Sequence, residues 1–265
     1  TTERRGEGDS VTHTRPAGSL GVLLTAWEDG VDHVKFFGNY QNTFKPAAFD
    51  FSLAENEGVL DPETAASYEG GVKARLGKGR ADFEVSAFRM DFENLVTSTV
   101  VNGLPALINA GTTRFQGVDV ALDTRLAGDV WAHGAYSFHD GKFVNFERSF
   151  DGVVTQLGGK RFEMSARHLA TGGVTFQPKG DRGLAGSVTV KYVGDRYLDK
   201  RNRALAPSYV TSDVGVGYRL RKYELRLDLR NAGNARDAIS ESELGDAQYY
   251  RMTARRIEFS LGVRF

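Results

Sequence analysis

The sequence predicts an all-β fold, a transmembrane antiparallel β-barrel wall of about eleven strands, from three observations. Apolar and polar residues alternate along most of the 265-residue chain, which is the period of a strand with one apolar face. Many alternating segments exceed ten residues, whereas soluble strands are most often about 5 to 6 residues long and tilted membrane strands need about 9 to 11. Short turns also alternate with long loops, as they do between the two membrane faces of such barrels.

Turn residues divide the chain into the predicted strands. In chain order these strands cover residues 18–27, 32–44, 63–76, 81–99, 106–126, 129–146, 166–178, 184–199, 208–221, 223–235 and 252–265. One of them changes phase: Phe83, Val85 and Ala87 alternate in one register, and residues 88–92 continue in the other. We therefore expect a β-bulge near Ala87, because an extra residue would restore a single apolar face.

The connections between these strands form two sets. Short links rich in turn residues lie at 28–30, 77–79, 127–129, 179–181 and 221–222. The other set is mostly long, at 45–62, 147–165, 200–207 and 236–251, with Asn102-Gly103 as its one short hairpin. Short periplasmic turns, long extracellular loops and aromatic belts near both strand ends are typical of outer-membrane barrels. A soluble β-sandwich is the alternative fold, but charges recur on the less apolar face of strand after strand, which favours a wet lumen.

Composition excludes several classes of function. The chain has 34 Lys and Arg against 34 Asp and Glu, so it lacks the basic excess of a nucleic-acid binder. It has no cysteine, which excludes disulfides, thiolate metal sites and cysteine nucleophiles. Its five histidines are dispersed, and the two that share a strand face, His133 and His139, would lie roughly 20 Å apart at about 3.3 Å per residue. We therefore predict no metal site and no cofactor.

Several short motifs follow one another in a specific order. They are Leu60-Asp61-Pro62-Glu63, residues 68–73 (YEGGVK), residues 88–94 (FRMDFEN), Asn109-Ala110-Gly111, residues 117–120 (GVDV), residues 192–197 (YVGDRY), residues 208–213 (SYVTSD), residues 229–234 (LRNAGN) and the terminal Phe265. With these motifs the chain resembles, over essentially its whole length, the C-terminal part of the barrel of TonB-dependent outer-membrane receptors. The resemblance implies that residues 1–265 form the C-terminal half of a 22-stranded barrel, with the N-terminal plug domain and the first strands absent from this chain. Because the chain begins at Thr1 without an initiator methionine, we expect it to be a processed product or a fragment of a longer chain.

The same resemblance implies a receptor in the cell outer membrane of a Gram-negative bacterium. Its function would be TonB-energised uptake of a scarce ligand, a ferric siderophore above all, and it would not be an enzyme. The implied partners are a TonB-type energy-transducing protein acting through the plug, outer-membrane lipid and lipopolysaccharide, the barrel assembly machinery and a small-molecule ligand. Two alternatives remain open: a passive porin-like channel, and an outer-membrane barrel hydrolase, for which no local Ser, His and acid motif is present.

Three sets of residues are candidates for function. The most basic stretch lies in one long loop and suits either an anionic ferric chelate or lipopolysaccharide phosphates; its members are Arg196, Tyr197, Lys200, Arg201 and Arg203. Charges of both signs lie on the predicted lumenal face, where they would pair across strands or with the plug; they are Glu69, Lys73, Arg75, Asp119, Asp123, Arg125, Lys191, Arg226, Asp228, Arg230, Arg256 and Glu258. The resemblance adds an assembly signal in the last strand, made of Phe259, Leu261, Val263 and Phe265.

The assembly signal gives a first testable prediction. Deleting Phe265 from the full-length protein is expected to lower its yield in the outer membrane, because the assembly machinery would no longer recognise the terminal aromatic residue. Immunoblots of outer-membrane and whole-cell fractions measure this yield against the amount synthesised. An unchanged outer-membrane yield would contradict the assignment.

Overall fold

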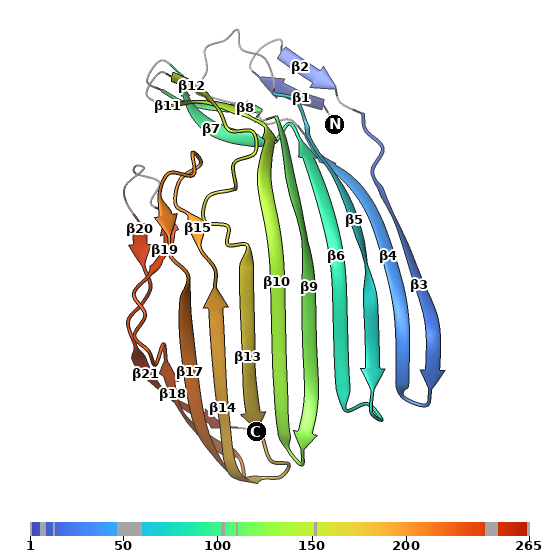
Figure 1. Cartoon of the computed structure of the whole chain (residues 1–265), viewed down its shortest axis with the longest axis vertical. Coiled ribbons are helices and arrows are strands. Elements are labelled where there is room, and N and C mark those ends of the chain that lie inside the picture. The colour runs from blue at the N-terminus through green and yellow to red at the C-terminus, as the bar shows by residue number, and fades with distance from the viewer. Residues whose placement is uncertain are drawn as a thin grey trace.

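An eleven-stranded antiparallel sheet forms most of the protein (Figure 1). The computed structural model describes residues 2–5, 9–12, 14–46, 60–101, 104–109, 111–150, 153–241 and 249–263. The strands of the sheet follow chain order from edge to edge, as in an up-and-down barrel wall; they are β3 (Gly18–Asp29), β4 (Asp32–Lys45), β5 (Glu63–Leu76), β6 (Ala81–Glu93), β9 (Thr112–Ala127), β10 (Val130–Asn145), β13 (His168–Phe176), β14 (Arg182–Val193), β17 (Tyr209–Leu220), β18 (Tyr223–Arg230) and β21 (Arg256–Val263). In these residue ranges, no helix has the length and hydropathy that crossing a membrane requires.

Short hairpins make up the rest of the described strands. They lie at the end of the sheet opposite the short turns (Figure 1) and pair as β1 (Thr2–Arg5) with β2 (Asp9–Thr12), β7 (Val96–Val101) with β8 (Leu104–Asn109), β11 (Glu147–Phe150) with β12 (Val153–Gln156), β15 (Arg196–Tyr197) with β16 (Leu205–Ala206), and β19 (Ala238–Glu241) with β20 (Tyr249–Arg251). The two sets of connections therefore lie at opposite ends of the sheet, as the turn chemistry predicts. Most of the predicted loop 45–62 lies outside the described residues, as do Asn102-Gly103 and Phe265.

Several predicted strands are too long at the loop end. The strands predicted at 81–99 and 106–126 stop at Glu93 and start at Thr112, and the residues between them form the separate hairpin β7–β8. Left-handed backbone marks both breaks, with φ of 56° at Asn94 and 76° at Gly111. The strands on either side of the predicted hairpin at 102–103 do pair there, with Val101 opposite Leu104, but they lie outside the large sheet because the left-handed residues turn the chain away before β7 and after β8. Asn231, with φ of 50°, ends β18 in the same way, well before the predicted residue 235.

The predicted bulge near Ala87 is wrong. Residues 81–92 of β6 pair without a register shift with β5 on one side and with β9 on the other. The register shifts in the described part of the sheet lie elsewhere, between Thr25 and Trp27 in β3 and, where β10 pairs with β9, between Val130 and Trp131 and between Phe143 and Asn145. β6 is therefore a regular strand, and the phase change means that its apolar residues pass from one face of the sheet to the other along its length.

The sheet has an apolar face and a polar face, which strand β18 illustrates. Its apolar face carries Leu225, Leu227 and Leu229, and these pair with apolar residues of β17 and β21, such as Val216 and Phe259. Its polar face carries Glu224, Arg226, Asp228 and Arg230. The cross-strand pairs continue both faces from strand to strand across the whole sheet. The apolar face extends from Trp27 in β3 to Leu261 in β21.

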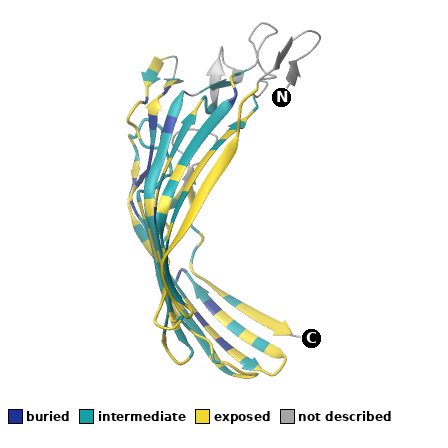
Figure 2. Cartoon of the chain, turned by 90° about the vertical axis from the view of Figure 1, so that its right-hand side faces the viewer, coloured by how far each residue is buried: buried dark blue, intermediate teal, exposed yellow. Residues whose placement is uncertain are grey.

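Crowding around glycines identifies the polar face as the concave one. A Cβ atom added to Gly173 or Gly215 on the polar face would lie 2.6 Å from its neighbours. On the apolar face, a Cβ added to Gly70 or Gly172 would meet nothing closer than 3.6 Å or 3.8 Å. Side chains converge on the inside of a curved sheet and diverge on its outside, and the sheet seen from its edge is strongly curved (Figure 2).

The sheet is a single layer, and its apolar face is uncovered. Ile257, Phe259 and Leu24 are 71%, 70% and 61% exposed, and β3 is exposed along its whole length (Figure 2). The buried apolar cluster of the described residues lies at the loop end of β10, where Phe143 of that strand packs with Phe146 and Leu157. A soluble sandwich would bury this face under a second sheet, so the single exposed layer contradicts that alternative.

Candidate functional site

The polar face carries every charged residue that the sequence assigned to a lumenal wall. Cross-strand register puts Glu69, Lys73 and Arg75 on the same face as Asp119 and Asp123. It also puts Lys191 opposite Thr211 on this face, which continues through Asp213 to the charged residues of β18 and β21. Arg125 lies opposite Trp131 at the turn end and contacts Gly128 O.

The strongest ion-pair network lies on β17, β18 and β21. Arg226 makes two bonds to Asp228, from Nε to Oδ2 at 2.7 Å and from Nη2 to Oδ1 at 2.8 Å. Arg230 Nε lies 3.2 Å from Glu258 Oε2, and Arg256 Nε lies 2.5 Å from Glu258 Oε1. Asp228 is only 4% exposed, so the network holds a carboxylate away from solvent even without any further layer over it.

Asp213 joins this network, although it is not among the candidate residues predicted from the sequence. Its carboxylate accepts a bond from Lys191 Nζ at 3.3 Å and one from the Asn231 backbone N–H at 2.9 Å. Arg230 Nη1 lies 3.7 Å from it. The alternation of β17 could have identified Asp213, since it occupies a polar-face position between Thr211 and Gly215.

Pairs on the other half of the polar face are more exposed. Lys73 Nζ lies 3.0 Å from Glu84 Oε1, and Arg75 Nε lies 2.6 Å from Asp82 Oδ1. Both acidic partners come from the neighbouring strand β6, so the cross-strand pairing that the sequence suggested is present here. All four side chains are between 44% and 49% exposed, and such solvated pairs contribute little stability.

Aromatic side chains form a cluster on the polar face, nearer to the long-loop end of the sheet. Phe88 packs against Phe115 and His139, with ring centroids 5.4 Å and 5.5 Å apart. His139 Nε2 lies 2.9 Å from Asp119 Oδ1. His133 lies nearer to the short-turn end of β10, the strand that also carries His139, and is opposite Asp123 and Gly173. Within the described ranges no three His, Cys, Asp or Glu side chains are grouped so that they could hold a metal ion.

The basic loop residues lie close in sequence but contact separate partners. Arg196 is 3% exposed, its guanidinium lies 5.1 Å from the Tyr209 ring, and neither Nη1 nor Nη2 has a hydrogen-bond partner among the described residues. Lys200 Nζ lies 3.4 Å from Glu163, and Arg201 lies 4.4 Å from the Phe150 ring. Arg203 pairs with Asp199, which also accepts bonds from the Arg203 and Ala204 backbone. The structure therefore does not direct these side chains toward one point.

Arg161 connects this loop to the preceding one, and no pattern in the sequence singles it out. Its Nη2 donates to the carbonyls of Ser165 at 3.3 Å and Asp195 at 3.1 Å, and its guanidinium lies 5.4 Å from the Tyr197 ring. Its backbone N–H and carbonyl both bond to the Asn202 amide. Two long loops are thereby held together beside the sheet end.

Replacing Arg161 by glutamine is expected to loosen both loops. Hydrogen bonds to charged groups contribute about 1.5–3 kcal/mol, so the open population should rise by about tenfold or more. Limited proteolysis of the full-length protein, with cleavage mapped to residues 158–208, measures this rise. Lys160→Gln, which changes an exposed neighbour, is the control, and equal cleavage of both variants would contradict the role of Arg161.

Comparisons with known proteins match the chain to a β-barrel family, in agreement with the curved antiparallel sheet. The family model for the "TonB dependent receptor-like, beta-barrel" domain matches residues 3–232. The metal-pseudopaline receptor CntO of Pseudomonas aeruginosa UCBPP-PA14 is 26% identical over 90% of this chain, and the ferrioxamine B receptor of Salmonella typhimurium SL1344 is 26% identical over 75%. The chain spans only 30% and 26% of the lengths of these relatives. Among solved structures, the ferric yersiniabactin uptake receptor FyuA of Yersinia pestis aligns with a TM-score of 0.75 at 16% identity, covering 94% of this chain and 37% of that one.

Proposed function

The chain belongs to the TonB-dependent receptor β-barrel family, and from this premise we propose that it forms part of an outer-membrane receptor for TonB-energised uptake of a ferric siderophore. The observation that carries the proposal is the family match across a curved single sheet with one uncovered apolar face. Lipid would cover that face, since a membrane is the solvent that favours it. Among the described residues the edge strands β3 and β21 each pair on one side only, so strands from elsewhere in the protein would close the barrel.

A plug domain outside this chain would cover the polar face. Charged groups buried in a lumen need partners, and the half-exposed pairs Lys73–Glu84 and Arg75–Asp82 leave donors and acceptors available for a second layer. The network around Asp228 is already complete within the sheet, so we assign it to holding the wall together. Plug rearrangement driven by a TonB-type partner would then open a path along the more loosely paired half.

The relatives and the loop charges support a ferric siderophore as the proposed ligand. The relatives named above are receptors for metal-pseudopaline and ferrioxamine B. The loop carrying Lys200, Arg201 and Arg203 adds cationic groups at the end of the sheet that would face outward, and these suit an anionic ferric chelate. The buried Arg196 would position this loop through Tyr209.

The last strand would also serve assembly. Phe259, Leu261 and Val263 form the exposed apolar row of the edge strand β21, and they are 70%, 61% and 41% exposed. An unpaired apolar edge is a template for pairing with another strand. We assign this row, with Phe265 beyond it, to recognition by the barrel assembly machinery.

Uptake of radioactive iron tests the function. Cells with the full-length gene as their one siderophore receptor are grown under iron limitation and given a panel of ⁵⁵Fe-loaded siderophores. We expect saturable uptake of at least one siderophore, and its loss when the TonB-type protein is deleted. Uptake that survives this deletion would indicate a passive channel, and breakdown of the ligand at the cell surface would indicate a hydrolase.

A further inference from the structure

The apolar face ends in a charged band on β6, β9 and β10. Two consecutive cross-strand rows on this face consist of polar and charged residues. They are the row of Arg89, Gln116 and Asp140 and the row of Asp91, Arg114 and Lys142. The row directly below them is Ala87, Val118 and Phe138. This boundary explains the phase change in β6, because from Arg89 onward the outward positions are polar and Phe88 and Met90 lie on the inner face.

Cations outnumber carboxylates in this band. Asp91 accepts a bond from Arg89 Nε at 2.7 Å and one from Arg114 Nε at 2.6 Å. Asp140 lies 2.7 Å from Lys142 Nζ and 2.8 Å from Arg167 Nη2. Each group therefore holds two cations and one carboxylate, which leaves a charge of about +1 in each. The four cationic side chains are 36% to 48% exposed, so they keep donors free for an anion.

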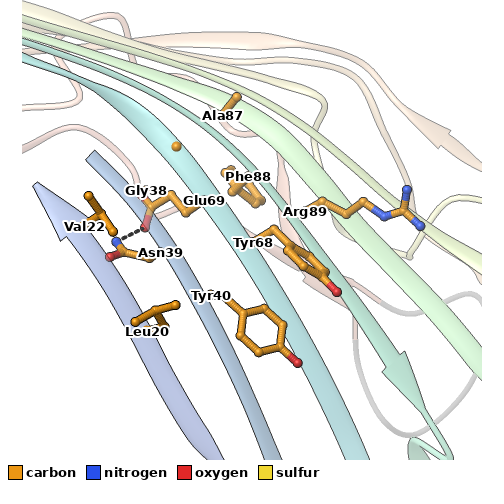
Figure 3. Close-up of a pocket in the computed structure, with 11 residues that line it drawn as sticks. Leu20, Val22, Gly38, Asn39, Tyr40, Tyr68, Glu69, Ala87, Phe88 and Arg89 are labelled. Atoms are coloured by element: carbon orange, nitrogen blue, oxygen red, sulfur yellow. Dashed lines mark hydrogen bonds between the residues drawn. The ribbon is translucent and has the colours of Figure 1, made fainter. Parts of the chain in front are cut away.

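An apolar groove of about 590 Å³ lies next to the first of these groups (Figure 3). Its floor is a row of small residues, Gly38, Gly70 and Ala87, which are direct cross-strand neighbours. The row above consists of Leu20, Tyr40, Tyr68 and Arg89, and the rings of Tyr40 and Tyr68 are 5.1 Å apart. Asn39, Glu69 and Phe88 also line the groove, but strand alternation turns their side chains to the opposite face, so their backbone contributes to its floor.

We propose that the groove and the charged band together bind lipopolysaccharide, with an acyl chain in the groove and the two lipid A phosphates on the two cation pairs. The proposal rests on the proposed function for the outer-membrane location, because the band lies at the long-loop end of the sheet. Two separate cation pairs match a headgroup with two phosphates, whereas a common phospholipid such as phosphatidylglycerol has one. Arginine suits this role because its planar donors bind phosphate at two points.

Lipid retained by the purified full-length receptor tests the proposal. Receptor is extracted in detergent and washed, and lipid A per receptor is measured by mass spectrometry. We expect the double variant Arg89→Gln/Arg114→Gln to retain at least about tenfold less lipid A than the wild type. Gly70→Leu, which fills the groove where a Cβ has room, should lower retention without changing the charge.

Arg182→Gln/Lys222→Gln is the matched control, since it removes two cations at the short-turn end of the sheet and should retain wild-type lipid. Migration of unboiled samples on a gel verifies that each variant forms a folded barrel. Undiminished lipid A in the Arg89→Gln/Arg114→Gln variant would overturn the proposal. The wild-type receptor is also incubated with phosphatidylglycerol vesicles or with lipopolysaccharide. Equal displacement of its lipid A by the two would overturn the proposal as well. Iron uptake is measured in the same strains. If the proposed function is wrong, the wild type will show no uptake, and the lipid measurement can still be interpreted by itself.

Discussion

Replacing Gly173 by alanine is expected to lower the yield of folded full-length barrel sharply, whereas alanine at the adjacent Gly172 should leave it near wild type. A Cβ at Gly173 would lie 2.6 Å from the Val188 carbonyl oxygen and from the His133 ring. The ring can move, but the carbonyl belongs to the paired strand β14, so the sheet itself must shift. Overpacking of this kind costs about 1–3 kcal/mol.

Gly172 makes the comparison sharp because it lies one residue away on the outer face. Its added Cβ would meet nothing closer than the His133 carbonyl oxygen at 3.8 Å, which is an ordinary contact. Refolding into lipid vesicles, followed by the mobility shift between unboiled and boiled samples, measures the folded fraction of each variant. Equal folded fractions would mean that the polar face is not the crowded, concave side.

Replacing Asp228 by alanine is the second change with a large expected effect. The substitution removes the acceptor of both Arg226 bonds and one neighbour of Arg230, and it leaves these guanidinium groups in a site where Asp228 was only 4% exposed. Removing one partner of a buried ion pair costs about 3–5 kcal/mol. Since the Arg226 side chain is 38% exposed, we expect a smaller loss of about 2–3 kcal/mol in the free energy of unfolding.

Asp82→Ala is the control for this prediction. Asp82 also bonds to an arginine Nε on the polar face, at 2.6 Å from Arg75, but its side chain is 49% exposed. An exposed pair of this kind is worth about 0–1 kcal/mol, so urea unfolding of the full-length protein in vesicles should separate the two variants. Similar midpoints for both would show that burial does not set the strength of these pairs.

The central parts of the strands could be predicted from the sequence because a two-faced strand alternates visibly. In β18 and β21 each leucine or phenylalanine on the outer face is separated by a charged or small residue on the inner one, and the predicted start of β18 at Tyr223 is correct. The ends of the strands are less visible. Loop-end breaks depend on left-handed residues such as Asn94 and Asn231, and nothing in their neighbours distinguishes them from polar-face positions.

The phase change in β6 misled the prediction for a physical reason. A bulge is the usual way to restore a single apolar face, but Arg89 and Asp91 point outward because the apolar face ends there across three strands at once. One strand read alone cannot reveal this. The boundary becomes visible only when the register aligns Arg89 with Gln116 and Asp140.

The candidate site was predictable where it follows alternation and unpredictable where it depends on loops. Polar-face positions such as Arg226, Arg230 and Glu258 follow from the strand period, and the network that joins them comes from cross-strand register. Arg161 and the burial of Arg196 arise from the packing of two loops against each other, which leaves no periodic trace in the sequence. The roles of all these residues in uptake remain predictions.

We propose that the outer face of the sheet contacts lipid and that the inner face contacts water or protein. This chain has no cysteine, so single cysteines can be placed at positions 224–229 of β18 without background labels from it, and a spin label attached to each in the full-length receptor in vesicles. We predict collisions with oxygen, which concentrates in lipid, at 225, 227 and 229, and low oxygen accessibility at 224, 226 and 228. Accessibility without this period of two, or with the opposite phase, would contradict the account.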